Sequence, residues 1–116
     1  MAVNRQKIYE ITQGKCFYCG CELNFKDFHI DHFKSRATGG KQSKNLVPAC
    51  SDCNYCKGKM DIEDFRIKLQ EMLEDKFVGR LIKKYYGVNN KTIKFYFEEV
   101  KDGNLQNSIN VILDRQ

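Results

Sequence analysis

Long apolar segments are absent from this 116-residue sequence. No run of about eighteen apolar residues occurs, so the sequence contains no segment expected to cross a membrane as a helix. The N-terminal residues 1–5 also lack the apolar core of a secretory signal peptide. These two absences lead us to expect a soluble, cytoplasmic protein with no membrane partner.

Repeats, low-complexity tracts and long linkers are missing as well. Their absence predicts a single compact domain, with residues 1–60 as its core and residues 61–116 packed on that core. A chain of this length buries only a modest apolar core, so a bound metal is a plausible source of additional stability.

Positive charge is unevenly distributed along the chain. Residues 1–60 contain ten Lys and Arg against five Asp and Glu, whereas residues 61–116 contain ten of each. The whole excess of five positive charges therefore lies in the first half, which favours a polyanionic partner such as nucleic acid. The alternative interpretation is that the sequence pI near 8.9 is ordinary for a small protein.

Four of the six cysteines form two C-x-x-C knuckles, Cys16 with Cys19 and Cys50 with Cys53. Two intervening residues allow both sulfurs of a knuckle to face one ion, so the four thiolates suit a closed, structural zinc site. Disulfides are the alternative, but nothing in the sequence directs secretion and a reducing compartment favours metal binding.

Two further cysteines leave the ligand set open. Cys21 follows Cys19 closely and competes with it for one position; the knuckle spacing favours Cys19, and we expect Cys21 to be a small buried apolar group. Cys56 repeats the knuckle spacing after Cys53, so spacing alone does not rank Cys50, Cys53 and Cys56.

An Asp-His pair lies between the two knuckles, on a predicted strand over residues 28–33. Asp31 offers a hard oxygen ligand to a hard cation, and His32 offers a base that titrates near neutrality. Adjacent residues on a strand point to opposite faces, so the two side chains can take different roles. His29 shares a face with Asp31. The structural alternatives are a surface carboxylate and a histidine satisfied within the strand.

At these residues the sequence resembles the HNH endonuclease family, which has the ββα-metal fold. The resemblance covers roughly residues 14 to 60. The matching residues are Asp31-His32, Asn45 at the start of a second strand, Asn54 after the second knuckle and Lys57-Gly58 three residues later. The sequence departs from the commonest family pattern at Ser35 (many members have proline), at Asn54 (many have histidine) and at Cys56, an additional thiol.

The resemblance implies a metal-dependent hydrolysis of DNA phosphodiester bonds, by nicking or cutting, that leaves 5′-phosphate and 3′-hydroxyl ends. His32 would be the general base, and Asp31 with Asn54 would hold one divalent cation, Mg²⁺ or Mn²⁺. Asn45 would keep the two strands in register. The family pattern also selects Cys50 and Cys53 over Cys56 as zinc ligands.

Other residues receive weaker assignments. His29 is a candidate for indirect contact with the metal or the phosphate, and Asn54 alternatively forms an amide hydrogen bond near a helix start. Small HNH proteins serve restriction, homing and phage DNA packaging, which indicates a bacterial or phage-infected cell. The candidate phosphate contacts are Arg36, Lys44, Lys57 and Lys59.

Two other functions are compatible with the sequence. The first is a catalytically inactive, zinc-stabilised DNA-binding or protein-interaction module; the joint presence of Asp31, His32 and Asn54 argues against it. The second is association of residues 61–116 with another protein or in a homodimer. Exposed aromatic side chains would support that association, with Tyr85, Tyr86, Phe95 and Phe97 as the candidates.

The expected fold class is α+β: a zinc-stapled ββα-metal core with C-terminal helices and a β-hairpin. Asn4 is expected to cap a helix over residues 5–12, and Ser51 or Asp52 the helix after the second strand. An apolar stripe from residue 62 predicts further helices, with a bend at Gly79. Alternation over residues 93–97 and 109–113, around a turn at residues 101–104, predicts a hairpin at the C-terminus.

Overall fold

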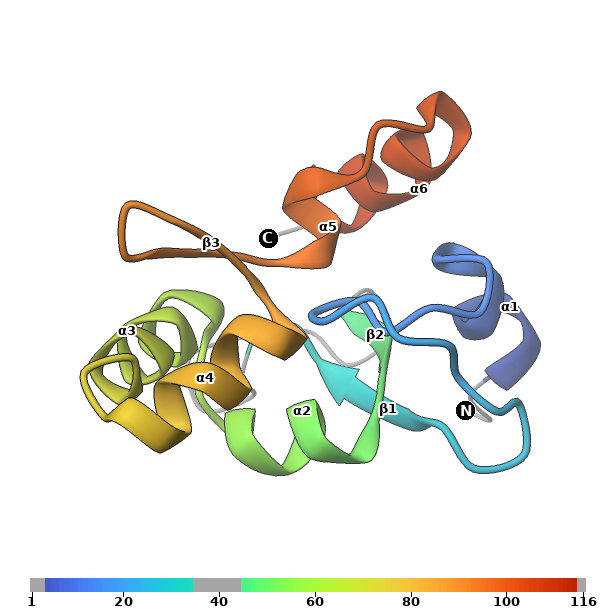
Figure 1. Cartoon of the computed structure of the whole chain (residues 1–116). Helices are drawn as coiled ribbons and strands as arrows, with labels where there is room; N and C mark the ends of the chain where they lie inside the picture. Colours follow the sequence, from blue (N-terminus) through green and yellow to red (C-terminus); the bar gives the residue numbers. More distant parts are fainter. Residues whose placement is uncertain (1–3, 35–44, 115–116) are drawn as a thin grey trace.

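A computed structural model describes residues 4–34 and 45–114 (Figure 1). Helices and two small antiparallel sheets alternate along the chain, which confirms the α+β class. No helix within the described ranges is both long and apolar enough to span a membrane. The elements are α1 (Arg5–Ile11), β1 (His29–His32), β2 (Leu46–Ala49), α2 (Ser51–Lys57), α3 (Ile62–Met72), α4 (Lys76–Tyr85), β3 (Gly87–Asn89), β4 (Thr92–Lys94), α5 (Tyr96–Glu99) and α6 (Gly103–Asp114).

The strands β1 and β2 pair antiparallel, and α2 begins directly after β2, so the predicted strand–strand–helix order is present. Asp31 pairs with Val47, which places the carboxylate opposite a fully buried position.

The prediction for the cap of α2 was wrong. Cys50, in an extended conformation, caps the helix, and its sulfur accepts the N–H of Cys53 at 3.4 Å. Ser51 and Asp52 already lie inside the first turn.

The N-terminal helix α1 forms as expected, because the Asn4 side chain accepts the N–H of Lys7 at 3.1 Å. The first knuckle follows, and it contacts the C-terminal half through its backbone. The carbonyls of Phe17 and Tyr18 accept the N–H groups of Phe97 and Tyr96, at 3.1 and 2.8 Å respectively. These bonds tie the knuckle to the start of α5.

One hydrophobic core contains residues from both halves of the chain. At its centre, fully or nearly fully buried aromatic rings pack face to face and edge to face. Phe17 stacks on Phe97 with ring centroids 4.7 Å apart, and Phe65 stacks on Phe95 at 5.4 Å. The helices α3 and α4 lie side by side on one flank of the β1–β2 pair, and α1 lies on the other (Figure 1). The first knuckle and α3 through α5 therefore share one interior.

The break between α3 and α4 lies at residues 73–75, before the bend predicted at Gly79. The chain leaves α3 after Met72, and the Asp75 side chain starts α4 by accepting the N–H groups of Phe77 and Val78, each at 2.9 Å. Gly79 lies inside α4 rather than at a bend. Its role is close packing, because a Cβ at this position would lie 2.7 Å from the carbonyl oxygen of Leu73.

The predicted position of the hairpin was also wrong. A hairpin is present in the C-terminal half, but it consists of β3 and β4, whereas residues 103–114 form α6. The apolar residues of this segment fit both periods, since Ile109 and Val111 alternate while Ile109 also lies four residues after Leu105. Burial follows the helical period: Ile109 is fully buried, and Val111 is 48% exposed. Packing against the core therefore selected the helix.

Candidate functional site

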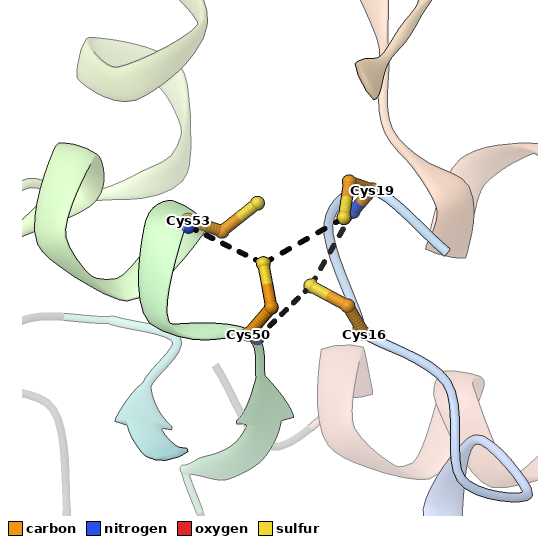
Figure 2. A group of neighbouring side chains, drawn as sticks. All are labelled: Cys16, Cys19, Cys50 and Cys53. Carbon is orange, nitrogen blue, oxygen red and sulfur yellow. Dashed lines mark hydrogen bonds between the residues drawn. The ribbon is translucent and has the colours of Figure 1, made fainter. Parts of the chain in front are cut away.

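The four knuckle cysteines converge at one point, as Figure 2 shows. Cys16 and Cys19 come from the loop after α1, and Cys50 and Cys53 come from the start of α2. All four sulfurs lie within 4.8 Å of one another. Tetrahedral zinc with bonds of about 2.3 Å separates its sulfur ligands by roughly 3.8 Å, and the Sγ atoms of Cys19 and Cys50 lie 3.7 Å apart. The donor set and its dimensions fit a structural zinc ion.

The surroundings of the sulfurs suit thiolates. Backbone N–H groups of Cys19 and Cys50 point at the sulfur of Cys16, at 3.5 and 3.4 Å. The hydroxyl of Tyr86 lies 2.9 Å from the sulfur of Cys53. Burial, together with the nearby Cys53 sulfur, raises the pKa of Tyr86, so the phenol keeps its proton and can serve as a hydrogen-bond donor to a Cys53 thiolate. Sequence reasoning did not identify this contact, because Tyr86 is far from the knuckles in the chain.

Neither of the two remaining cysteines belongs to the four-sulfur cluster found among the described residues. Cys21 was predicted to be buried, but it is exposed. Its backbone carbonyl accepts the N–H of Cys16 at 2.8 Å, so Cys21 closes the knuckle through its backbone. Cys56 is half-buried on α2.

The Asp31 carboxylate lies beside this zinc centre, buried between β1 and α2, and three side chains surround it. The Tyr18 hydroxyl donates to Oδ2 at 2.5 Å, and the Lys57 ammonium lies 3.0 Å from the same oxygen. The Asn54 amide donates to the other oxygen, Oδ1, at 3.4 Å. The fold thus brings Asp31 and Asn54 together across 23 residues of sequence.

The protonation of this cluster follows from its burial. Desolvation, and then the adjacent Asp31 carboxylate, raise the pKa of Tyr18 well above its usual value. The phenol therefore stays protonated and acts as a hydrogen-bond donor. Beside it, the buried carboxylate and ammonium form an electrically balanced pair, and this balance offsets part of the cost of removing both charges from water.

Lys57 was predicted to contact a phosphate, but the structure places its side chain in the interior of the protein. Its side chain is 0% exposed, and its ammonium donates to the carbonyl of His32 at 2.8 Å in addition to pairing with Asp31. A lysine held in this way has no path to a nucleic-acid backbone outside the protein. No local sequence pattern marks this residue as buried, because the Lys57-Gly58 dipeptide is equally compatible with a solvated helix end.

The other predicted residues lie around this cluster. His32 is half-buried at the end of β1, and His29 is exposed at its start. Asn45 is buried and forms two hydrogen bonds with the backbone of Lys34: its Oδ1 accepts the N–H at 2.8 Å, and its Nδ2 donates to the carbonyl. These bonds join the ends of the segment between β1 and β2.

Of the three remaining candidates for phosphate contact, Lys59 is exposed just after α2. Arg36 and Lys44 lie outside the described residues. Ser35, one of the departures from the family pattern, lies outside them too.

Comparison with known proteins agrees with this geometry. The family model described as HNH endonuclease matches residues 16–60. The chain is 39% identical over 46 residues to a CRISPR-associated endonuclease Cas9 of Corynebacterium diphtheriae, covering 38% of this chain and 4% of the relative. It is 31% identical over 74 residues to an SPbeta prophage-derived putative HNH endonuclease, YoqL, of Bacillus subtilis, covering 54% of this chain and 31% of the relative.

A third relative is the Septu protein PtuB of Bacillus thuringiensis, 34% identical over 59 residues, with 47% of this chain and 23% of the relative covered. The chain thus spans less than a third of the length of each of these relatives.

The fold is similar to that of part of a solved structure. The crystal structure of the Type II-C Cas9 enzyme from Actinomyces naeslundii aligns with a TM-score of 0.54 at 19% identity, over 96% of this chain and 10% of the other. The knuckles, the strand–strand–helix order, the family match and this fold likeness agree. Residues 16–60 of this chain are therefore similar to the HNH endonuclease family in sequence, and they share its order of strand, strand and helix.

Proposed function

We propose that this chain hydrolyses phosphodiester bonds of DNA, by nicking or cutting, with one divalent cation held by Asp31 and Asn54. The observation that carries this proposal is that Asn54 lies next to the buried Asp31 carboxylate: its Nδ2 donates to Oδ1 at 3.4 Å, so the two side chains can share one cation once the amide turns its oxygen toward it. A carboxylate and an amide oxygen are the hard ligands that Mg²⁺ or Mn²⁺ accepts, with water and phosphate oxygens completing the coordination. A cation bound there would offset the charge of the scissile phosphate.

His32 is the proposed general base. It follows Asp31 on the same strand, and neutral imidazole accepts the proton of an attacking water at physiological pH. Lys57 holds the strand in place through the carbonyl of His32. Asn45 closes the adjacent segment through the backbone of Lys34, which supports its assignment to keeping the strands in register. The family implies products with 5′-phosphate and 3′-hydroxyl ends.

Structural zinc on the four knuckle cysteines completes the proposed cofactors. Lys59 is exposed and within the described residues, and we propose that it contacts a DNA phosphate. We propose the same contact for Arg36 and Lys44. His29 is exposed and is kept as a candidate for indirect contact with phosphate.

We place the protein in the cytoplasm of a bacterial or phage-infected cell, because one similar protein is described as prophage-derived. We further propose that residues 61–116 support the nuclease core rather than forming a separate unit.

A nicking assay on supercoiled plasmid tests the function. Zinc-loaded protein should relax the plasmid in Mg²⁺ or Mn²⁺, because the phosphate charge is then offset, and EDTA should stop the reaction. The assay separates supercoiled, nicked and linear DNA on a gel. Folded, zinc-loaded protein that leaves the plasmid supercoiled in both cations would favour the non-catalytic binding module instead.

An exposed apolar ridge on α4 supports a second proposal, association with another copy of this chain. Phe77, Leu81 and Tyr85 occupy successive turns of the helix, and Phe77 is 78% exposed. The candidate aromatics Tyr86, Phe95 and Phe97, in contrast, are buried. A parallel ridge on α4 is cationic, and none of its members forms an ion pair within the described part of the chain. These cations are Lys76, Arg80 and Lys84.

The complementary surface is on α3. Ile67 is 52% exposed on the outer side of that helix, with Glu63, Asp64 and Glu71 around it. The apolar ridge of α4 can therefore pack against Ile67 on α3 of a second copy, and the cations beside the ridge then face the acids around Ile67. A dimer would also supply two active sites, as a double-strand cut requires.

Sedimentation velocity over a range of concentrations checks this surface. We expect wild type to form a dimer, and Leu81→Glu to sediment as a monomer because it places an acid facing the acids of α3. Val111→Glu alters an exposed apolar residue on α6 and should leave the dimer intact. Wild type that is monomeric at every concentration would exclude this dimer and leave the ridge to another partner.

A further inference from the structure

The Asp31 carboxylate is held by one residue of the first knuckle and by one residue of α2, the helix that begins at the second knuckle. Tyr18 lies between the ligands Cys16 and Cys19, and its hydroxyl donates to Oδ2 of Asp31 at 2.5 Å. Lys57 lies one helical turn after the ligand Cys53, and its ammonium is 3.0 Å from the same oxygen. The first knuckle and the helix that begins at the second knuckle therefore each contribute one side chain to one oxygen of the carboxylate.

The other oxygen faces a different residue. Oδ1 of Asp31 lies on the side of Asn54, the second proposed cation ligand. Because Tyr18 and Lys57 are both fully buried and both reach Oδ2, they fix the rotation of the carboxylate and direct Oδ1 toward Asn54. Groups that orient a metal ligand in this way tune the affinity of the site.

We propose that Tyr18 and Lys57 are positioning residues for Asp31, and that through them the zinc centre and the divalent-cation site are coupled. This inference rests on the proposed cation site at Asp31 and Asn54. Zinc fixes the backbone on both sides of Tyr18 and the first turn of α2, and these elements place the two groups that orient the carboxylate. Linkage is reciprocal, so a cation on Asp31 must in turn favour retention of zinc.

The first test measures Mn²⁺ affinity without DNA, by electron paramagnetic resonance of zinc-loaded protein. Tyr18→Phe removes a single oxygen from a buried ring, and we expect it to weaken Mn²⁺ binding by about 10- to 100-fold. The matched control is Tyr9→Phe, which removes a hydroxyl that donates only to the carbonyl of Leu23 at 3.3 Å. Equal Mn²⁺ affinity in Tyr18→Phe and wild type would overturn the positioning role.

The second test measures the equilibrium affinity for zinc by competition with a zinc-selective chelator. Millimolar Mg²⁺, compared with monovalent salt of equal ionic strength, should raise the zinc affinity of wild type and have no such effect on Tyr18→Phe. A zinc affinity that is the same with and without Mg²⁺ in wild type would overturn the coupling. Neither measurement uses DNA, so a protein that cuts no substrate but shows these effects would refute the nuclease proposal and leave the coupling intact.

Discussion

Replacement of His32 by alanine should abolish DNA cleavage while leaving DNA binding in place. A positioned general base contributes about 10²- to 10⁴-fold to a rate, and we expect a loss of this size in the single-turnover rate constant. DNA affinity should stay within a few fold of wild type, because the proposed phosphate contacts lie on other residues. Rapid-quench kinetics gives the rate constant, and fluorescence anisotropy gives the affinity.

His29→Ala is the matched control for this variant. It removes the other histidine of β1, which is exposed at the start of the strand, and it should lower the rate far less than His32→Ala because its proposed contact with the phosphate is indirect. If His32→Ala cut DNA as fast as wild type, the role of general base would pass to His29 or the mechanism would be wrong. Loss of binding together with cleavage would instead indicate that His32 supports the fold.

Loss of a zinc ligand should have the largest effect on stability. Cys50→Ser removes one of the four sulfurs, and it isolates the loss of the metal ligand because a serine hydroxyl can still cap α2 by accepting the N–H of Cys53. Structural zinc contributes about 10–16 kcal/mol of binding free energy at neutral pH, which equals or exceeds the roughly 5–15 kcal/mol by which small domains are stable. We therefore expect Cys50→Ser to be zinc-free and unfolded at room temperature.

Mass spectrometry measures the zinc content of each variant, and circular dichroism measures whether the variant is folded. Wild type should contain about one zinc per chain, as one tetrahedral four-thiolate site requires. Cys21→Ser is the control, since Cys21 is exposed and lies outside the four-sulfur cluster. That variant should retain its zinc and its thermal midpoint. Cys50→Ser protein that keeps its spectrum without zinc would contradict the structural role of the metal.

The sequence alone was sufficient to predict the parts of the site that depend on spacing. Two C-x-x-C knuckles specify their geometry locally, and the structure brings all four predicted sulfurs together. The approach of Asn54 to Asp31 was predicted as well, from the order of strand, strand and helix. Such features can be predicted because a few consecutive residues determine where each side chain points.

Other features depend on contacts distant in sequence, and these were missed. Lys57 is buried because Asp31, 26 positions earlier in the chain, neutralises it, and no local pattern carries that information. The terminal segment was predicted as a strand, because an alternating apolar pattern and a helical one coincide at Ile109. The core contacts of α6 decide between them, and they form only after the chain has folded.

The backbone bonds between the first knuckle and α5 limit how the segment that matches the family, residues 16–60, can be transferred to another protein. A graft of residues 16–60 alone would expose Phe17 and Tyr18, whose rings pack on Phe97, Phe65 and Phe95 of the second half. The unit that inheritance or protein engineering can move intact is therefore much longer than the recognisable motif. The likeness to the Actinomyces enzyme, which covers 96% of this chain, has the extent expected of that longer unit.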